Sequence, residues 1–500
     1  MKRKIKKILI ANRGEIALRI QRTARELGIR TVAIYSFEDS HAPFVLNSDE
    51  AYSLNGSTAN ETYLNIPKIL DVASVSGCDA LHPGYGFLSE NSGFAAAVEQ
   101  RDIIFIGPPS NAIKKMGSKT SARRLMSEAK VPIVPGSLDP IKSYDELSLI
   151  ASEIGFPLLI KAADGGGGKG MRKVDSFSDL KSSFERAQAE AQSAFGSNRI
   201  YVEKLLMNPR HIEVQILADA YGNVVYLGER ECSVQRRHQK VVEESPSAAV
   251  TPELRSQLGR AGVNVAKACG YVNAGTVEFL LDANKQFYFL EMNTRLQVEH
   301  PVTELVYGID LVKAQIQIAE GEELTIKQSE IAPRGHAIEC RLYAEDPENN
   351  FFPSTGTITH YQPSEGYGIR NDSGICAGFV VSHLYDPLLA KLIVWGKERK
   401  EAIDRMKRAL REYTIGGVAT TIPFCNFVMK HESFVQGNFD IGFVDKYYNN
   451  GKQTSNDIHN ILAASLAVAF MAKNRVSLLS TNSLETNNVN RWKLKRFEDA

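Results

Sequence analysis

The N-terminal part of the chain alternates short apolar runs with an amphipathic stretch. ILIA at 8–11 and TVAIY at 31–35 are apolar runs of strand length, and residues 14–27 between them place their apolar side chains on one helical face. This order predicts a strand–helix–strand unit in a parallel sheet over residues 1 to about 117. Because Gly14 is the single glycine in the first turn, the GxGxxG dinucleotide fingerprint is absent, and the pattern does not indicate NAD.

A second stretch reads strand, glycine run, strand: LLIKAADGGGGKGMRKV at 158–174. Four consecutive glycines have no side chains to pack and lose much entropy on ordering, so they predict a mobile flap whose bare N–H groups meet a phosphate. The stretch is not a P-loop, because Lys169 is followed by Gly170 rather than by Ser or Thr. A linker without a ligand is the alternative. Lys161 at the strand end favours the phosphate-binding interpretation, since a cation there lies beside the flap.

Polar and apolar residues alternate from His211 to Ile216 in the run RHIEVQILAD. His211, Glu213 and Gln215 share one face of the predicted strand, and apolar side chains share the other. His238 and Lys240 alternate in the same way further along the chain. Taken alone, these patterns favour a solvated edge strand over a binding site.

Two strand patterns flank the turn-like sequence DANKQ and predict a β-hairpin. If Asp282 and Phe287 close a four-residue loop, Leu280 lies opposite Phe289. The phenylalanines and leucines of both strands then make one face strongly apolar, which places the hairpin against a core.

The same register places Glu278 opposite Glu291. Directly opposed carboxylates repel each other, and the cost grows when they are half buried. A divalent cation between them removes that cost. Because Glu278, Glu291 and Asn293 offer only oxygen ligands, the hairpin predicts a site for Mg²⁺ or Mn²⁺.

The hairpin ends in FLEMNTRLQVEH, which has a charged or amide residue at every second position from Glu291 to Glu299. If the strand continues, these residues share one face. Arg295 supplies a fork for a small oxyanion, and Glu299 supplies a base. We interpret this face as a metal site followed by an anion site.

Composition restricts the function classes. The 500 residues are 43% hydrophobic and 23% charged with a formal net charge of +1, which fits a globular protein of roughly two to four domains and gives no sign of nucleic-acid or membrane affinity. Six cysteines include no CxxC pair, which favours reduced thiols and a cytoplasmic location. The apolar run at 463–472 is too short to span a bilayer of about 30 Å as a helix. We therefore expect a soluble protein.

Taken together, several motifs are specific: the chain resembles the biotin carboxylases of the ATP-grasp superfamily across roughly residues 4–447. The motifs are LIANRGEIA, HPGYGFLSEN, GGGGKGM, PRHIEVQ, ERECSVQRRHQKVVEE, EFLL, FLEMNTRLQVEHPVTE and GHAIECRLYAED. The resemblance implies an α/β fold with an N-terminal Rossmann-like (pre-ATP-grasp) domain, a central ATP-grasp domain with a mobile glycine-rich lid, and a C-terminal α+β domain. The implied boundaries are 1–117, 118–333 with the lid at about 134–205, 334–449, and a linker, amphipathic helix and polar tail at 450–500.

By similarity, ATP lies between the two lobes of the central domain. The implied contacts are Lys119, Lys161, Gly167, Gly168, Glu203, Lys204, Leu205, Leu206, His211, Gln235, His238, Glu278 and Glu291. Two Mg²⁺ or Mn²⁺ ions are implied on Glu278, Glu291 and Asn293. Two positions depart from the commonest family pattern: Ser118 stands where an Asp is frequent, and Asp164 weakens phosphate attraction at the flap.

The resemblance also implies the chemistry. The implied substrate and catalytic residues are Lys240, Arg295, Gln297, the Val298 backbone, Glu299, Arg341 and Tyr85. Bicarbonate, readied by Glu299, attacks the γ-phosphate of ATP and forms carboxyphosphate, which collapses to CO₂ and phosphate. The phosphate removes the ureido proton of biotin, and Arg341 stabilises the biotin enolate.

Biotin is expected on a separate biotin carboxyl carrier protein. A carboxyltransferase subunit is expected to be a further partner, and a homodimer to be the assembly. The one near match to a biotinylation motif is VMKH at 428–431. No turn residue flanks Lys430, so a helix is predicted there. The final carboxyl acceptor stays open between acetyl-CoA, another acyl-CoA and pyruvate.

Two other functions fit the same fold. One is an ATP-grasp ligase that passes a different activated carboxylate to an amine, and the other is a nucleotide-binding regulator without catalysis. Both lose ground because Arg295, Glu299 and Arg341 are all present, a set that only the biotin interpretation uses in full.

Overall fold

The computed structural model describes residues 2–163 and 171–448. All of these residues belong to one compact unit. Outside the described residues lie Asp164, Gly167 and Gly168 of the predicted flap, and the predicted linker, helix and tail at 450–500.

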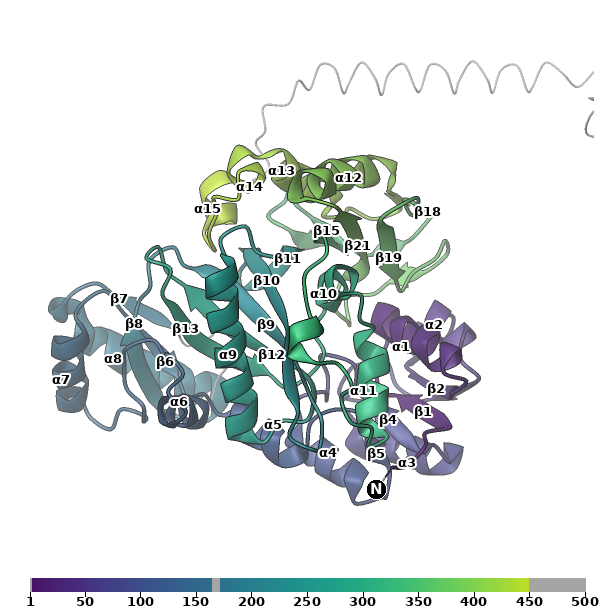
Figure 1. Ribbon diagram of the computed structural model, residues 1–500, viewed down its shortest axis with the longest axis horizontal. Coiled ribbons are helices and arrows are strands. Elements are labelled where there is room, and N and C mark those ends of the chain that lie inside the picture. Colours follow the sequence, from purple (N-terminus) through teal and green to yellow (C-terminus); the bar gives the residue numbers. More distant parts are fainter. Residues whose placement is uncertain (1, 164–170, 449–500) are drawn as a thin grey trace, which may run out of the picture. The chain divides into compact units, whose positions relative to one another are not determined.

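The N-terminal segment is built on a five-stranded parallel sheet in the order β3-β2-β1-β4-β5 (Figure 1). Its strands are β1 (Lys7–Ile10), β2 (Arg30–Tyr35), β3 (Glu50–Ser53), β4 (Ala80–His82) and β5 (Ile104–Phe105). Its helices are α1 (Gly14–Glu26), α2 (Pro43–Leu46), α3 (Ile66–Ser76), α4 (Ser92–Glu99) and α5 (Ser110–Gly117). Side chains of β1 enter apolar cores on both sides, Ile8 on one and Leu9 on the other. The predicted strand–helix–strand unit is confirmed.

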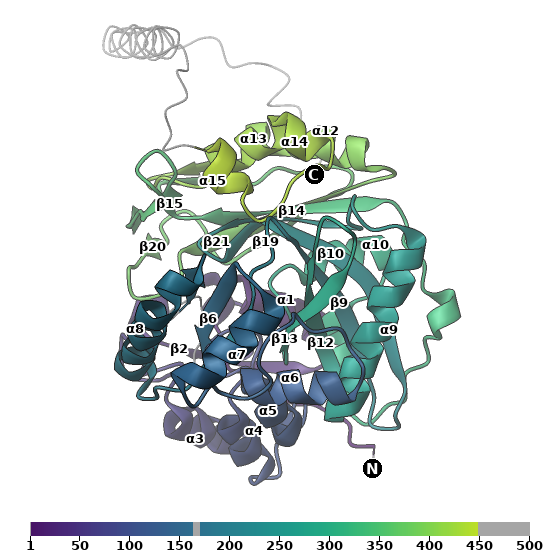
Figure 2. The ribbon, with the colours of Figure 1, turned by 90° about the vertical axis from the view of Figure 1, so that its left-hand side faces the viewer.

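The central segment begins with a small lobe on a three-stranded antiparallel sheet, β7-β6-β8. Its elements are α6 (Lys119–Glu128), α7 (Tyr144–Ile154), β6 (Leu158–Ala162), β7 (Arg172–Val174), α8 (Phe177–Phe195) and β8 (Ile200–Lys204). Figure 2 shows α7 and α8 beside β6. The Ser118 hydroxyl accepts a hydrogen bond from the Ser121 N–H at the start of α6, so this residue serves as the helix N-cap.

The rest of the chain is organised on an eight-stranded sheet in the order β13-β12-β9-β10-β11-β14-β21-β19. Its strands are β9 (Arg210–Ala218), β10 (Val224–Arg236), β11 (Gln239–Ser245), β12 (Asn273–Leu281), β13 (Phe287–Asn293), β14 (His336–Tyr343), β19 (Ile369–Ser373) and β21 (Leu388–Gly396). The strands β11 and β14 pair across the predicted boundary at residue 333, so the sheet is continuous there. The predicted domain boundaries stay predictions.

The helix α9 (Pro252–Cys269) covers one face of this sheet (Figure 1). The Thr251 side chain caps its first turn and Gly270, at a positive φ, ends it. Its buried residues include Leu254, Leu258, Ala261 and Val265, at helical spacing. At Gly259 a Cβ would meet the Tyr226 ring at 2.3 Å, so only glycine lets the helix approach β10 this closely.

The remaining elements complete the fold. They are η1 (Phe37–Asp39), α10 (His300–Tyr307), α11 (Leu311–Ala319), η2 (Gln328–Glu330), β15 (Glu345–Asp346), β16 (Phe352–Pro353), β17 (Gly356–Thr357), β18 (His360–Gln362), β20 (Val380–Val381), α12 (Arg399–Glu412), β22 (Thr414–Gly416), α13 (Ile422–Lys430), α14 (Glu432–Val435) and α15 (Phe443–Tyr447). The prediction that Lys430 lies in a helix is confirmed by α13.

The hairpin of β12 and β13 has the predicted pairing of Glu278 with Glu291, but by a different route. Leu280 lies opposite Tyr288 rather than Phe289, so the predicted loop closure is wrong. The register then shifts by one residue between Phe279 and Glu278. A β-bulge on the β13 side therefore restores the opposition of the two glutamates.

The expectation of a solvated edge strand for the run RHIEVQILAD is wrong. Strand β9 lies between β10 and β12 inside the sheet. His211, Glu213 and Gln215 are buried, and Glu213 and Gln215 are fully inaccessible to solvent. The polar face of this strand therefore borders a buried polar region.

Candidate functional site

Lys240 is the centre of the buried polar region. Its ammonium donates hydrogen bonds to Glu213 at 2.5 Å, to Glu278 at 2.8 Å and to Glu299 at 2.7 Å. Burial alone lowers the pKa of Lys240, but the three carboxylates outweigh burial and raise it well above its ordinary range. Lys240 is therefore a fixed cation that joins β9, β12 and the turn before α10.

Glu299 is fully buried between two cations. Its Oε1 accepts the hydrogen bond from Lys240, and its Oε2 accepts one from Arg341 at 2.8 Å. Burial raises the pKa of Glu299, but Lys240, Arg341 and Arg230 together hold it well below its ordinary range. Glu299 is therefore an ionised carboxylate, and each of its oxygens accepts a hydrogen bond from a cation.

The two opposed glutamates of the hairpin differ in their environment. Glu278 is buried, accepts hydrogen bonds from Lys240 and Asn293, and lies 2.8 Å from the His211 Nε2. Burial raises the pKa of Glu278, but Lys240 and His211 lower it by more, so Glu278 is ionised. Burial and the charge of Glu278 raise the pKa of Glu291. Among the described residues none donates a hydrogen bond to Glu291, so this carboxylate is open to a cation.

These residues fit a hard divalent ion. Glu278, Glu291 and Asn293 present only oxygen ligands and amide groups at the end of one hairpin, and Glu291 lacks a protein cation of its own at hydrogen-bond distance in the described segments. Lys119 and His211 lower the pKa of Glu291, but burial and the charge of Glu278 outweigh them, so a bound cation would stabilise this carboxylate.

A second group of basic residues lies where the small lobe faces the hairpin. Lys161 in β6 forms an ion pair with Glu203 in β8. Burial lowers the pKa of Lys119, and Lys161 lowers it further, while Glu291 raises it. Burial and the charge of Lys161 also lower the pKa of His238. Lys119 and Lys161 thus repel each other and favour the neutral form of His238, which is the environment expected where a polyanion binds.

The other predicted nucleotide contacts flank this group. Lys204 ends β8 and donates to the Phe156 carbonyl at 2.7 Å. Leu205 and Leu206 follow directly, and both are half-buried. Gln235 lies in β10 opposite Lys240 of β11.

The predicted continuation of the strand past Asn293 is wrong, because β13 ends at this residue. The residues after it still converge, but through hydrogen bonds across a turn. Arg295 donates to Gln297 Oε1 at 2.8 Å and to Asn293 Oδ1 at 3.1 Å, and it pairs with Glu90 at 2.9 Å. The guanidinium is thereby held at the edge of a cavity.

This cavity, of about 460 Å³, adjoins the Lys240 region. Its lining includes Tyr85, Arg295, Val298 and Arg341, all predicted as substrate residues. Tyr85 follows β4, where two hydrogen bonds of 2.7 Å from the Asn12 amide to backbone carbonyls fix the loop. The N-terminal loop, the segment between β13 and α10, and β14 thus each contribute to the cavity wall.

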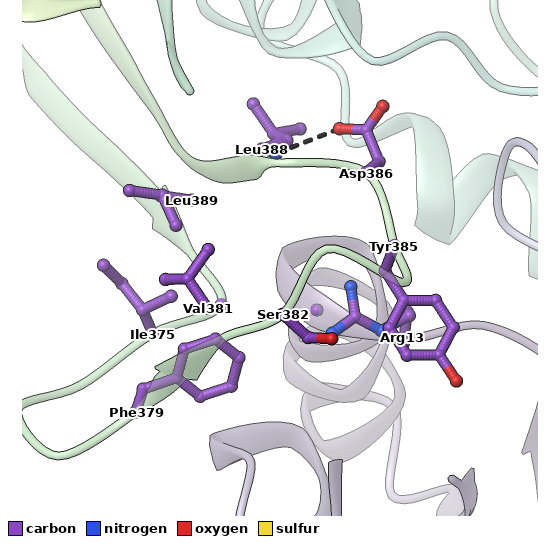
Figure 3. Close-up of a pocket in the computed structure, with 11 residues that line it drawn as sticks. Arg13, Ile375, Phe379, Val381, Ser382, Tyr385, Asp386, Leu388 and Leu389 are labelled. Atoms are coloured by element: carbon purple, nitrogen blue, oxygen red, sulfur yellow. Dashed lines mark hydrogen bonds between the residues drawn. The ribbon is translucent and has the colours of Figure 1, made fainter. Parts of the chain in front are cut away.

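A smaller pocket lies beside this cavity and shares its wall of Arg13 and Tyr385 (Figure 3). The Arg13 guanidinium lies 4.3 Å from the centre of the Tyr385 ring and pairs with Asp39 at 2.6 Å. Figure 3 shows the apolar side chains Phe379 and Val381 away from this arginine. The segment that carries Tyr385 is therefore fastened to the N-terminal segment at the cavity's rim.

Several site residues were missed by sequence reasoning. Arg230 is fully buried and donates to Glu213, Gln215 and Thr303. Glu90 pairs with Arg295, although the motif HPGYGFLSEN, which contains it, was noted. The alternation of β9 marked Glu213, and the motif ERECSVQRRHQKVVEE contains Arg230. Neither pattern pointed to the contact between them, because the partners of Arg230 are distant in sequence.

Comparison with known proteins gives the same picture for each segment. The chain matches three protein families: Biotin carboxylase, N-terminal domain, at 4–113; Carbamoyl-phosphate synthase L chain, ATP binding domain, at 118–327; and Biotin carboxylase C-terminal domain, at 339–446. Biotin carboxylase 1 of Bacillus subtilis is 52% identical over 444 residues, which cover 89% of this chain and 99% of that protein. The chain belongs to the biotin carboxylase family.

Two solved structures of biotin carboxylases fit the assignment. The crystal structure of a biotin carboxylase–βγ-ATP complex from Campylobacter jejuni has a TM-score of 0.86 at 44% identity, covering 89% of this chain and 99% of that one. The biotin carboxylase domain dimer of Hydrogenobacter thermophilus 2-oxoglutarate carboxylase, with MgADP and bicarbonate, also scores 0.86, at 47% identity, covering 91% and 100%.

The family defines the fold and the reaction. The chain is an ATP-grasp ligase with the three-part biotin carboxylase fold, and its activity is the ATP- and bicarbonate-dependent carboxylation of biotin. In the described residues, no helix combines the length and apolar character that crossing a membrane requires.

Proposed function

We propose that this protein transfers a carboxyl group from bicarbonate, through carboxyphosphate, to biotin on a separate carrier protein. The observation that carries the proposal is the series of contacts from Lys240 through Glu299 to Arg341, which runs from the paired glutamates to the 460 Å³ cavity. The end at the paired glutamates suits a phosphoryl donor with a metal ion. The end at Arg341 and the cavity suits an apolar ring system with one polar edge.

Bicarbonate binds between Lys240, Arg295 and Gln297, with the Val298 backbone as a further contact. Glu299 accepts its proton, which sharpens the attack of the oxyanion on the γ-phosphate of ATP. The pKa of Glu299 lies well below its ordinary range while Lys240 and Arg341 face it. Lys240 and Arg295 hold the bicarbonate anion, and the negative charge that bicarbonate brings beside Glu299 raises the proton affinity of this carboxylate.

Lys119, Lys161 and His238 bind the phosphates, and Glu278, Glu291 and Asn293 hold Mg²⁺ or Mn²⁺. When bound, the metal ions neutralise the phosphate oxygens and the repulsion between the two glutamates. The relative that was crystallised with MgADP has the same fold, which supports this assignment.

Carboxyphosphate then splits into CO₂ and phosphate, and the phosphate takes the proton of the biotin ureido nitrogen. The nitrogen's electron pair attacks CO₂, which forms the new N–C bond. Arg341 stabilises the negative charge that develops on the ureido oxygen. Tyr85 lines the same cavity and orients the ring.

Biotin arrives on a partner, a biotin carboxyl carrier protein, and a carboxyltransferase subunit uses the product. The lysine of the near motif, Lys430, ends helix α13, and its neighbours Val428 and Met429 are buried in a core. A biotinylated lysine needs the exposed tip of a β-hairpin instead. Expression beside a biotin ligase, followed by intact mass measurement, should give no biotin adduct on Lys430, and an adduct would contradict a separate carrier.

The direct test is ADP release with bicarbonate, with and without free biotin. We expect biotin to stimulate release. A ligase of another kind would need an amine acceptor instead, and a regulator would show no turnover. Stimulation of ADP release by biotin would exclude a nucleotide-binding regulator without catalysis. Stimulation by an amine in the absence of biotin would favour an ATP-grasp ligase with an amine acceptor.

The acceptor and assembly belong to the proposal as well. The Bacillus subtilis relative, a biotin carboxylase, and one subunit of the pyruvate carboxylase of Methanothermobacter thermautotrophicus are both 52% identical to this chain. Identity therefore does not choose between acetyl-CoA, another acyl-CoA and pyruvate. The dimer named for the Hydrogenobacter thermophilus domain supports a homodimer. A cytoplasmic location remains the prediction from the cysteine pattern.

A further inference from the structure

Lys391 of β21 is a fully buried cation beneath the substrate cavity. Its ammonium donates to the Val298 carbonyl at 2.9 Å and lies 3.1 Å from the Glu15 carboxylate. The Val298 carbonyl belongs to the peptide bond that leads to Glu299. An ammonium so deep in the protein is costly unless its partners are well placed, so these contacts define a specific geometry.

Glu15 lies in the first turn of α1, where the helix dipole favours a carboxylate. The atom that faces Lys391, Oε1, also accepts a hydrogen bond from the Tyr85 hydroxyl. The other oxygen has no hydrogen-bond partner among the described residues. Glu15 therefore connects the tyrosine of the cavity wall to the buried lysine through one atom.

The distance between these groups is set by the backbone. At Gly374, between β19 and β21, a Cβ would meet the Glu15 backbone nitrogen at 2.6 Å. The Gly374 N–H donates to the Leu389 carbonyl at 3.1 Å, which ties this turn to β21. The start of α1 and the strand of Lys391 are thus packed backbone to backbone, and the ion pair spans a rigid junction.

The charged residues opposite Lys391 on the neighbouring strands have ion-pair partners of their own. Asp372 and Arg341 lie opposite Lys391 on the two neighbouring strands. Asp372 is paired with Arg370 at 2.7 Å, and Arg341 is paired with Glu299 at 2.8 Å. In the described part of the chain, Glu15 is therefore the one acidic residue within hydrogen-bond distance of the Lys391 ammonium.

We propose that Glu15 and Lys391 are a positioning pair for the carboxylation reaction. The pair holds Tyr85 on the biotin side and the Val298–Glu299 peptide on the bicarbonate side at a fixed separation. This proposal rests on the proposed function. Lys391 is fully buried, and Glu15 borders the cavity with its Oε1 engaged by Tyr85 and Lys391. Each acts through the group it holds: Glu15 through the tyrosine, and Lys391 through the turn that carries the base.

The two halves of the pair have separable effects. Glu15→Gln keeps an oxygen that accepts from Tyr85 and leaves the Lys391 contact with Val298, but removes the charge between them. We expect bicarbonate KM to stay within about twofold and the stimulation of ADP release by biotin to fall roughly fivefold. The combined change Glu15→Gln with Lys391→Met removes both charges together, so no buried charge is left unpaired. We expect it to raise bicarbonate KM roughly tenfold as well, because the Val298 carbonyl loses its donor.

A matched control separates position from stability. Glu229 and Arg255 form an ion pair at 2.6 Å between β10 and α9, away from the cavity. Glu229→Gln with Arg255→Met should leave bicarbonate KM and biotin stimulation within about twofold of the wild type. ATP KM and the thermal midpoint are measured for every variant.

The proposal is overturned if the Glu15/Lys391 double variant keeps both bicarbonate KM and biotin stimulation, or if it changes them only as much as the control pair does. If the double variant folds poorly, Lys391→Arg decides instead. This change keeps a cationic donor and should keep bicarbonate KM within about threefold, and a tenfold rise contradicts positioning through the carbonyl. Absence of biotin-stimulated release in the wild type refutes the proposed function itself, before any variant is compared.

Discussion

Glutamates face each other across several antiparallel strand pairs of the described sheet, and two of these glutamate pairs have opposite electrostatic outcomes. Glu278 and Glu291 face each other across β12 and β13, and Glu243 and Glu339 across β11 and β14. In the first pair Glu278 is held ionised by Lys240 and His211, and Glu291 is half-buried and open to a cation. In the second pair both carboxyls are fully buried.

The second pair has few partners. One oxygen of Glu243 accepts from Arg341 at 2.5 Å, while its other oxygen and both oxygens of Glu339 have no hydrogen-bond partner among the described residues. Burial raises the pKa of Glu243 to about 7 and that of Glu339 well above its ordinary range. The same pattern of opposed acids therefore has two solutions: a cation where ions can enter, and a retained proton where they cannot.

The largest expected effect on activity comes from removing a charge from the first pair, Glu278 and Glu291. Glu291→Gln should lower metal-dependent ADP release roughly 100-fold or more, because an amide does not balance the charge of Mg²⁺. The measurement is ADP release across a Mg²⁺ titration, with circular dichroism to check the fold. Near-normal release at ordinary Mg²⁺ would refute the distinction between the two pairs.

The next largest effect concerns Arg341, the cation that pairs with Glu243 of the second pair. Arg341→Gln should lower biotin carboxylation about 100-fold but bicarbonate-dependent ATP cleavage no more than about tenfold, since the arginine acts on the enolate after carboxyphosphate forms. Arg399→Gln is the matched control, because Arg399 pairs at 2.7 Å with Glu244, the neighbour of Glu243 on the other face of β11. Equal loss of both activities in Arg341→Gln would assign the arginine to an earlier step.

A smaller effect concerns stability and pH. The pKa of Glu339 is raised in the folded state, so its stabilising contribution is complete below about pH 4–5, the unfolded range, and is lost as the pH rises. Glu339→Gln removes this loss and should raise the thermal midpoint by about 2 °C at pH 8 and by nothing at pH 4.5. Thermal unfolding at both pH values gives the comparison.

The neighbour Glu244 provides the control of opposite sign. Burial raises the pKa of Glu244, but Arg399 and His336 lower it below its ordinary range. Its contribution is present above the unfolded pKa and lost on acidification. Glu244→Gln should therefore destabilise the protein at pH 8, and a gain in stability there would show that the surrounding charges do not decide the outcome.

The smallest effect is that of Glu291→Gln on stability without metal. Removing one of two opposed charges should raise the thermal midpoint by about 1 °C, because the repulsion between partly solvated groups is only a few tenths of a kcal/mol. Addition of Mg²⁺ should stabilise the wild type and not the variant. A variant that Mg²⁺ stabilises equally would move the metal site away from Glu291.

Local pattern was enough to predict the elements that carry the site. The apolar runs of β1 and β2, the alternation in β9 and the turn sequence before β13 all predicted real strands. The pairing of Glu278 with Glu291 was predicted too. The predicted loop closure was wrong by one residue, and a bulge in β13 shifts the register back by one residue. Two independent deviations cancelled, which no alternation rule can foresee.

The rest of the site depends on contacts between distant parts of the chain. Whether β9 is an edge or a central strand is decided by β10 and β12, not by its own alternation. Lys391 reads as one polar residue in an apolar strand, and only the packing of α1 against the turn at Gly374 gives it Glu15 as a partner. Such pairs leave no periodic signal, because their spacing along the sequence is unrelated to any helix or strand repeat.

The pairing of β11 with β14 also has a consequence for synthesis. Residues 239–245 leave the ribosome well before residues 336–343, which complete the ladder on that side. Until then β11 is an uncovered edge with free backbone donors and acceptors, the kind of surface that pairs with a second nascent chain. The order of translation thus makes a strand from the middle of the finished sheet a temporary edge, open to aggregation until residues 336–343 have been made.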